Sequence, residues 1–300
     1  MNPLSLYRRC TLCPRRCAVN REITHGFCAE GATLRVARAA LHFWEEPCLS
    51  GSTGSGAVFF SGCGLRCLYC QNRSIAHRNY GKEIDAERLC EIFLELAAKG
   101  AANINLVTAT PFVPHVILAL DMAKKHGLAI PVVYNSGGYE NVETLHMLDG
   151  YIDIYLPDYK YRDAALAARF SSAPDYPDTV GAAIDEMLRQ TGEPRFGNDG
   201  MMKRGVIVRH LVLPGHTEDS MNVLRALWNA YGDRIFISIM NQYTPCGTYP
   251  DHPELSRRLT TYEYEKVLRL ARALGITNGY IQTGDTAKES FIPDFDETGV

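Results

Sequence analysis

The chain has 300 residues, of which 46% are hydrophobic and 22% charged, and its formal net charge is −3. This length and balance predict a globular protein with one large domain or two small ones, and they exclude a chain that is disordered throughout. The slightly negative charge gives no basis for nucleic-acid binding. No apolar stretch is long enough for a signal peptide or a membrane span, so we expect a cytoplasmic protein with no membrane or nucleic-acid partner.

Short apolar runs alternate with amphipathic stretches from residue 57 onward, which is the pattern of βα units around a parallel sheet. The expected strands cover residues 57–61, 103–108, 131–135, 151–156, 206–213 and 235–240. Apolar residues at helical spacing predict helices over 85–99, 113–126, 178–190, 217–231 and 261–274. Glycines at 100, 127, 192, 232 and 275 fit C-terminal caps of these helices. The fold class is α/β, and six units fit a partial (βα)6 TIM-like barrel, although a doubly wound open sheet has the same alternation.

Residues 1–50 do not follow this pattern, and residues 49–56, LSGSTGSG, read as a turn into the first strand. We expect a cysteine-rich metal-binding extension over 1–50 and a barrel over 51–300 that ends in an irregular tail, FIPDFDETGV. Eight of the ten cysteines lie in the first 70 residues. In a reducing compartment such clustering favours metal ligation or catalysis over disulfides.

Cys63, Cys67 and Cys70 follow the first expected strand in the segment CGLRCLYCQN, at the end of the sheet where catalytic loops gather in barrels. A structural zinc site needs four protein ligands, and no nearby residue supplies an obvious fourth. Iron–sulfur clusters are normally held by four thiolates, so a cubane held by three keeps one iron open for an outside ligand. Buried cysteines that act as small apolar residues are the alternative, which suits a single cysteine better than this triplet.

The C-x3-C-x2-C spacing, with Tyr69 directly before the third cysteine, resembles the signature of radical S-adenosylmethionine enzymes. From about residue 10 to the C-terminus, the chain is most similar to the branch named after pyruvate formate-lyase activating enzymes. The segments that carry this similarity are HFWEEPCLSG, GSGAVFFSGC, VVYNSGGYE, DIYLPDYKY, RGVIVRHLVLPG and PDFD.

The resemblance implies a [4Fe-4S] cluster on Cys63, Cys67 and Cys70 that binds the amino and carboxylate groups of S-adenosylmethionine at its open iron. It also implies that one electron, from a donor such as flavodoxin or ferredoxin, cleaves the cofactor to methionine and a 5′-deoxyadenosyl radical that abstracts a substrate hydrogen. The protein then positions the reacting carbon and excludes competing reactions. Such an oxidoreductase activity is expected to be anaerobic.

Other cofactor contacts are expected at the carboxyl ends of the strands. In the glycyl-radical activating enzymes, an arginine in the segment that VIVRHLVLPG resembles contacts the cofactor carboxylate, and Arg209 takes that role here because a guanidinium suits a carboxylate. His210 is its strand neighbour and should face the other side. The remaining cofactor-binding candidates are Tyr69, Thr108, Thr110, Asn135 and Ser136. Asp158, Lys160, Gln242 and Tyr243 also end strands, and the first two are expected to pair with each other.

The chain departs from many radical S-adenosylmethionine enzymes after the second strand, where NLVTATPF replaces the Gly-Gly-Glu that binds the methionine amino group. The threonines or backbone carbonyls would have to replace it, and ordinary capping of the strand end is the alternative for Thr108 and Thr110. Glu45 and Glu46, in WEEP, are typical of a solvated loop, with substrate or partner contact as the alternative.

A second set, Cys10, Cys13, Cys17 and Cys28, offers four thiolates, enough for a structural zinc ion or an auxiliary [4Fe-4S] cluster. Spacing does not distinguish the two. A short extension without helices or strands needs a stabilising cross-link, which favours a bound metal over four free thiols. His25 could replace one thiolate, although a surface histidine is the commoner case.

The resemblance favours abstraction of a hydrogen from a glycine of a partner enzyme, so a protein or peptide substrate is expected. A radical enzyme acting on a small molecule or another peptide is the alternative within this class. The rival from another class is a non-catalytic metal-binding interaction protein in which both cysteine sets are structural. The sequence alone does not name the substrate.

Overall fold

The computed structural model describes residues 2–282 and 293–300. Phe291 and Ile292 of the expected tail lie outside the described residues. The strands are β1 (Leu34–His42), β2 (Ser55–Phe60), β3 (Lys82–Ile84), β4 (Ile104–Val107), β5 (Val132–Ser136), β6 (Ile154–Pro157), β7 (Arg195–Phe196), β8 (Met202–Leu211), β9 (Phe236–Met240) and β10 (Gly279–Ile281). The α-helices are α1 (Pro47–Ser50), α2 (Arg73–Ala76), α3 (Ala86–Ala98), α4 (Val113–Lys125), α5 (Val142–Met147), α6 (Ala164–Ser171), α7 (Tyr176–Thr191), α8 (Thr217–Tyr231) and α9 (Thr261–Leu274). Short 3-10 helices are η1 (Pro3–Arg9), η2 (Thr110–Phe112), η3 (Gly232–Arg234) and η4 (Pro253–Ser256).

The strands form a mostly parallel sheet in the order β10-β9-β8-β6-β5-β4-β2-β1-β3. The six strands predicted from the sequence correspond to β2, β4, β5, β6, β8 and β9. They lie side by side in chain order, and each pairs in parallel with the next. A doubly wound sheet would reverse its strand order at a switch point, and this sheet does not. The partial-barrel prediction is therefore confirmed, and the described strands do not close into a full barrel.

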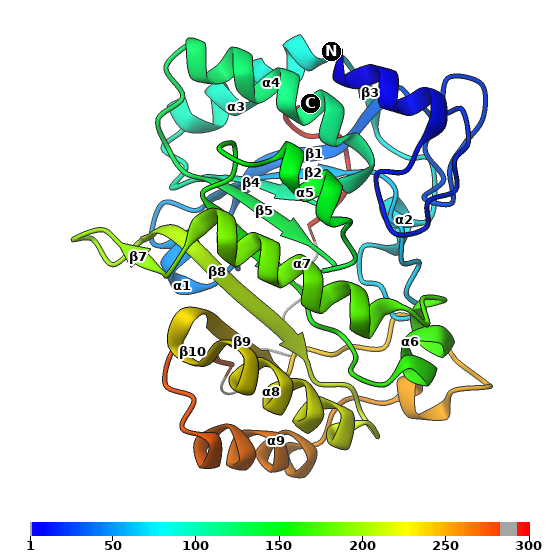
Figure 1. Ribbon diagram of the computed structural model, residues 1–300, viewed down its shortest axis with the longest axis vertical. Helices are drawn as coiled ribbons and strands as arrows, with labels where there is room; N and C mark the ends of the chain where they lie inside the picture. Colours follow the sequence, from blue (N-terminus) through cyan, green and yellow to red (C-terminus); the bar gives the residue numbers. More distant parts are fainter. Residues whose placement is uncertain (1, 283–292) are drawn as a thin grey trace.

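Helices α3 and α4 pack together at one end of the molecule and α8 and α9 at the other, with α7 between them (Figure 1). Their apolar faces and the sheet enclose one large core, in which Leu106, Val116, Leu120, Tyr134 and Ile184 are fully buried. Gly275 caps α9 with φ 80° and donates to the carbonyls of Ala271 and Arg272, as its position in the sequence predicts. No helix in residues 2–282 or 293–300 is long and apolar enough to span a membrane.

Residues 1–50, expected as an extension, also contribute a strand to the sheet. β1 pairs antiparallel with β2 along most of its length, and β3 pairs with the other edge of β1. The end of the chain lies against β1, because the Ala39 amide donates to the Thr298 carbonyl and the Glu297 amide donates to Ala37. The cysteine-bearing part of the expected extension is the irregular segment 10–31, which we call the N-terminal cysteine segment.

The carboxyl ends of the parallel strands lie at the same edge of the sheet. The residues that follow neighbouring strands are therefore in contact. Thr108 donates its amide to Asn135, and the Asp158 amide donates to Ser136. Asp158 in turn bridges to Arg209 of β8. In Figure 1 the arrowheads of β5 and β8 point to the side where α2, α6 and the N-terminal cysteine segment lie.

Candidate active site

A pocket opens at these strand ends, and it collects most of the candidate residues. It is lined by Cys63, Cys67, Cys70 and Tyr69 from the loop after β2, by Thr108, Asn135, Ser136, Asp158, Lys160 and Arg209 from later strand ends, and by Glu45 and Gln242. The residues come from seven different segments of the chain, most of which follow or end strands of the sheet.

The loop between β2 and α2, residues 61–72, carries the three cysteines and is called the catalytic loop below. Gly62 begins it with φ 80°, and its amide donates to the Ile75 carbonyl. The Leu65 amide points at the Cys63 sulfur at 3.4 Å, and the Ser171 hydroxyl at the Cys67 sulfur at 2.9 Å. The three cysteines of the loop thus line the pocket, and two of their sulfurs accept hydrogen bonds, one from the loop itself and one from Ser171 at the end of α6.

Burial makes the pocket unfavourable for isolated thiolates. It raises the pKa of Cys63 to about 11, with the neighbouring Cys67 adding to the effect, and it raises the pKa of Cys70 further. Thiolates are the form that binds metal, so these cysteines ionise readily only together with a cationic partner. An iron–sulfur centre supplies such charge.

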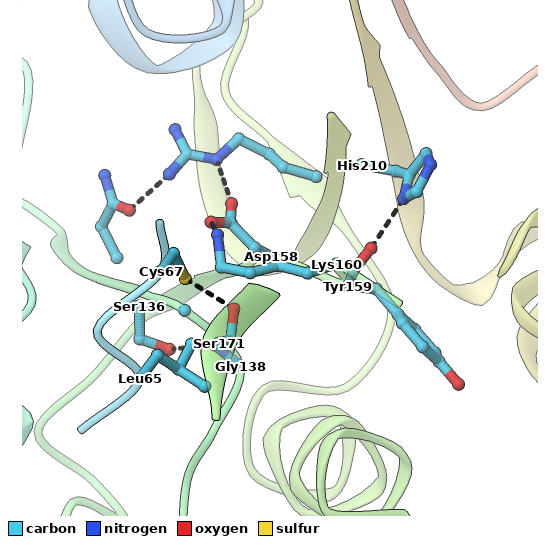
Figure 2. Close-up of polar contacts among 12 residues, drawn as sticks. Leu65, Cys67, Ser136, Gly138, Asp158, Tyr159, Lys160, Ser171 and His210 are labelled. Atoms are coloured by element: carbon cyan, nitrogen blue, oxygen red, sulfur yellow. Dashed lines mark hydrogen bonds and ion pairs between the residues drawn. The ribbon is translucent and has the colours of Figure 1, made fainter. Parts of the chain in front are cut away.

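Lys160 supplies fixed positive charge beside the cysteines. Burial acts to lower its pKa, but the Asp158 carboxylate and the Cys67 and Cys70 sulfurs outweigh burial, so the pKa lies above its usual range. Its Nζ donates to Asp158 Oδ2 at 2.5 Å, which is the expected pair. Figure 2 shows this contact between two residues that follow β6.

Arg209 lies partly buried in the pocket wall and already has partners. Its Nη1 lies 3.0 Å from Glu45 Oε2 and its Nε 3.2 Å from Asp158 Oδ1. Its Nη2 donates to Asn135 Oδ1 at 2.5 Å. An arginine has five N–H donors, so these three bonds leave two for a further carboxylate. His210 faces away, as expected, and is bonded to the Tyr159 carbonyl at 2.7 Å (Figure 2).

The WEEP carboxylates are not in a solvated loop, contrary to the commoner expectation for such a pair. Glu45 has a side chain only 8% exposed because it binds Arg209, and it also accepts from Asn105 at 2.9 Å. Glu46 is buried as well, and burial raises its pKa. No sequence pattern indicates the pairing of Glu45 with an arginine 164 positions later.

Thr108 and Thr110 separate in the structure. Thr108 lines the pocket with φ 60°, a strained value for a β-branched residue of the kind that collects at functional sites. Thr110 starts η2 and donates its hydroxyl to Glu140 Oε1 at 2.8 Å. It is not among the pocket-lining residues, because the turn at Thr108 redirects the chain.

The N-terminal cysteines lie on the far side of the catalytic loop from the pocket. A Cβ on Gly26 would be 3.2 Å from the Cys28 sulfur and 3.6 Å from the Cys17 sulfur. The Cys13 sulfur lies 3.5 Å from where a Cβ on Gly64 would stand. His25 is exposed, as expected for a surface histidine.

Both cysteine sets consist of free thiols. In the described part of the chain, no three His, Cys, Asp or Glu side chains are placed to hold a single metal ion. The thiolates of a four-iron cluster bind different irons, so their sulfurs need not converge on one point. The three pocket cysteines, with buried sulfurs and Lys160 beside them, fit a cluster on this ground.

Comparison with known proteins identifies the family of this chain. Residues 57–227 match the Radical SAM superfamily, and this is more than half of the chain. An uncharacterized protein of Methanocaldococcus jannaschii is 30% identical over 274 residues, covering 89% of this chain and 75% of that protein. The chain therefore belongs to the Radical SAM superfamily, whose members use S-adenosylmethionine and a [4Fe-4S] cluster.

Two further relatives are more distant. The pyruvate formate-lyase-activating enzyme of Clostridium pasteurianum is 25% identical over 177 residues, covering 55% of this chain and 65% of that enzyme. The crystal structure of Streptococcus suis SuiB bound to precursor peptide SuiA superposes with a TM-score of 0.50 and 13% identity, covering 75% of this chain. This chain spans about half of SuiB, 48% of its length, so this likeness concerns the fold alone.

Proposed function

We propose that this protein reductively cleaves S-adenosylmethionine at a [4Fe-4S] cluster held by Cys63, Cys67 and Cys70, and that the resulting radical abstracts hydrogen from a protein or peptide. The observation that carries the proposal is the convergence of these three cysteines, Lys160 and Arg209 on one pocket at the strand ends. Superfamily membership supports the same chemistry.

Cys63, Cys67 and Cys70 would hold the cluster, which would supply the one electron that breaks the sulfonium C–S bond of S-adenosylmethionine, giving methionine and a 5′-deoxyadenosyl radical able to take a hydrogen atom from the substrate. The electron comes from a one-electron donor of the flavodoxin or ferredoxin class. The residues of this chain hold and orient the cofactor. Lys160 offsets the negative charge of the thiolates, and the two unused donors of Arg209 suit the methionine carboxylate.

Thr108, Asn135 and Ser136 line the same pocket, as does Tyr69, and all four are proposed to contact the rest of the cofactor. The role proposed for Thr110 is structural. Its hydroxyl is committed to Glu140 and supports the chain behind the pocket.

The substrate class is the finer part of the proposal. The relative from Clostridium pasteurianum is named for activating pyruvate formate-lyase, and the SuiB structure contains a precursor peptide. The name of the first relative supports a polypeptide substrate, with a glycine of a partner enzyme as the first candidate, whereas the likeness to SuiB concerns the fold alone. On Cys10, Cys13, Cys17 and Cys28 we propose a second metal, either zinc or a further cluster.

The test is anaerobic reconstitution with iron and sulfide, reduction, and assay of 5′-deoxyadenosine from S-adenosylmethionine. The wild-type protein should form it and Cys67→Ala should not, while Cys90→Ala should retain formation because Cys90 is buried on α3 away from the pocket. A wild-type protein that carries a full cluster and forms no 5′-deoxyadenosine contradicts the proposal and supports a structural role for the metal.

Iron and zinc counted on the same samples assign the N-terminal set. About eight irons per chain indicate a second cluster, whereas about four irons and one zinc indicate a structural ion. Loss of the second metal in Cys13→Ala, with the first retained, would place it on these cysteines.

A further inference from the structure

The two cysteine regions lie on opposite sides of one stretch of main chain. Gly62 packs against Glu30 and the Cys28 carbonyl, and Arg66 stacks on Phe27 with its guanidinium 4.6 Å from the ring centre. The intervening residues line the pocket instead, and these are Cys63, Leu65 and Cys67. Alternate residues of the catalytic loop therefore face the N-terminal cysteine segment and the pocket.

Arg15, between Cys13 and Cys17, makes the densest contact across this boundary. Its Nε donates to the Gly64 carbonyl at 2.7 Å. Its Nη1 donates to the Ser172 carbonyl at 2.5 Å and its Nη2 to the Ser171 carbonyl at 3.1 Å. One guanidinium thus fixes the catalytic loop relative to the end of α6, and it is stacked on Phe27 at 4.1 Å from the ring centre.

The end of α6 carries the group that contacts Cys67. The Ser171 hydroxyl donates to the Cys67 sulfur at 2.9 Å, as Figure 2 shows. Behind it, Tyr161 lies 2.8 Å from Ser171, and Tyr69 lies 2.6 Å from Tyr161. Each hydroxyl has one proton, so when Ser171 donates to sulfur, Tyr161 donates to Ser171 and Tyr69 to Tyr161. The chain of hydroxyls ends on Cys67.

We propose that Arg15 is a positioning residue of the N-terminal cysteine segment: by holding the Gly64, Ser171 and Ser172 carbonyls, it keeps the Ser171 hydroxyl on the Cys67 sulfur and thereby sets the reduction potential of the cluster. This inference rests on the proposed function, because it takes Cys67 as a cluster ligand. It gives the N-terminal cysteine segment a role in the chemistry.

The sign of the effect follows from charge. Reduction adds an electron to the cluster, and a hydrogen bond to a ligating sulfur stabilises the more negative state. Loss of the Ser171 contact should therefore lower the potential. The change should be about tenfold in the reduction equilibrium, the effect of one charge-assisted hydrogen bond, and a tenfold change is about 59 mV for one electron.

The experiment compares Arg15→Ala with Arg16→Ala on the reconstituted full chain. Arg16 is the adjacent arginine of the same turn, but it forms an exposed ion pair with Glu143 at 2.9 Å. The potential is read on the electron paramagnetic resonance signal that changes on addition of S-adenosylmethionine, which separates the pocket cluster from any second one. We expect a lower potential in Arg15→Ala and in Ser171→Ala, a double variant no lower than either single one, and an unchanged potential in Arg16→Ala.

A second readout needs no cluster. In the metal-free protein, alkylation of Cys67, followed by mass spectrometry, should be about tenfold faster in Arg15→Ala than in the wild type because the loop opens more often. Arg16→Ala should remain within about twofold of the wild type. If Arg15→Ala does not fold, Arg15→Lys keeps the charge and one donor and should give an intermediate rate and potential.

The outcomes separate this inference from the function it rests on. Equal potentials in Arg15→Ala and Arg16→Ala, with 5′-deoxyadenosine still formed, overturn the role of Arg15 and leave the proposed function standing. Faster alkylation without a change in potential reduces Arg15 to a structural contact and also overturns the proposal. A wild type that never forms 5′-deoxyadenosine contradicts the proposed function, while the alkylation rates still report whether Arg15 holds the loop.

Discussion

The catalytic loop and the N-terminal cysteine segment each carry a cysteine set, but they are held in place differently. The catalytic loop starts at the end of β2, a strand buried at all six residues, and the sheet fixes where it begins. The N-terminal cysteine segment has no α-helix or strand between residues 10 and 31. Two of its own arginines order it: Arg15 donates to the catalytic loop, and Arg21 donates to Gly31 within the segment.

The two arginines do similar work because main-chain carbonyls outside helices and strands still need donors when they are buried. Arg21 is 2% exposed and donates to the carbonyls of Gly31 and Pro111, which joins the segment to η2. A guanidinium supplies several donors in one plane. The comparison shows that arginines can hold an irregular segment in place through hydrogen bonds to main-chain carbonyls, a role that a bound metal can also have.

The largest expected loss of stability comes from adding a side-chain atom at Gly62, where the catalytic loop packs against the N-terminal cysteine segment. Gly62 has φ 80°, and an added Cβ would stand 2.8 Å from the Cys28 carbonyl oxygen and against the buried Glu30. Gly62→Ala should lower the free energy of unfolding by about 4 kcal/mol or more, combining backbone strain with overpacking. Denaturant unfolding measures it.

Gly100→Ala is the matched control, since Gly100 has φ 84° and nothing within 4 Å of an added Cβ. It should lose about 1 kcal/mol through backbone strain alone. Similar losses in both variants would mean that the two regions are not packed tightly at Gly62.

A smaller loss is expected when the N-terminal cysteine segment alone is loosened. Arg21→Met keeps much of the side-chain volume over Tyr7 but leaves the Gly31 and Pro111 carbonyls without this donor. The free energy of unfolding should fall by about 3 kcal/mol, and hydrogen exchange should rise in residues 10–31 before it rises in the sheet. Arg8→Ala, which removes an exposed ion pair with Glu22, should change stability by no more than about 0.5 kcal/mol.

Much of the sheet could be predicted from the sequence because buried parallel strands are short, nearly continuous apolar runs. INLV and VVYNS are such runs, and both became strands, β4 and β5. β1 was missed because LRVARAALH mixes alanine and arginine with its apolar residues and pairs antiparallel at the side of the sheet. The short helices α5 and α6 gave too few helical turns for a periodic signal.

The site was harder to predict where it depends on long-range contacts. Strand-end reasoning placed Thr108, Asn135 and Ser136 in the pocket, because that reasoning needs only the order and direction of strands. Arg209 was placed there by the family resemblance instead. Strand-end reasoning failed for Thr110, since the left-handed turn at Thr108 cannot be read from NLVTATPF. Burial of Glu45 depends on Arg209, which no local pattern connects to it.

The smallest expected change in stability comes from the titration of Glu140, which lies beneath the N-terminal cysteine segment. Burial raises the pKa of Glu140 to about 7, although hydrogen bonds from Thr110 and Tyr134 act to lower it. A carboxyl whose pKa is raised by folding stabilises the protein fully below its unfolded pKa and loses that contribution as the pH rises through the folded pKa. The free energy of unfolding should therefore fall by about 2 kcal/mol between pH 5 and pH 8 from this group. Glu140→Gln keeps an acceptor and should flatten the fall, whereas Glu143→Gln, an exposed neighbour, should retain it. Equal pH dependence of the free energy of unfolding in wild type and Glu140→Gln would contradict the prediction, because it would show that burial does not oppose ionisation of the Glu140 carboxyl.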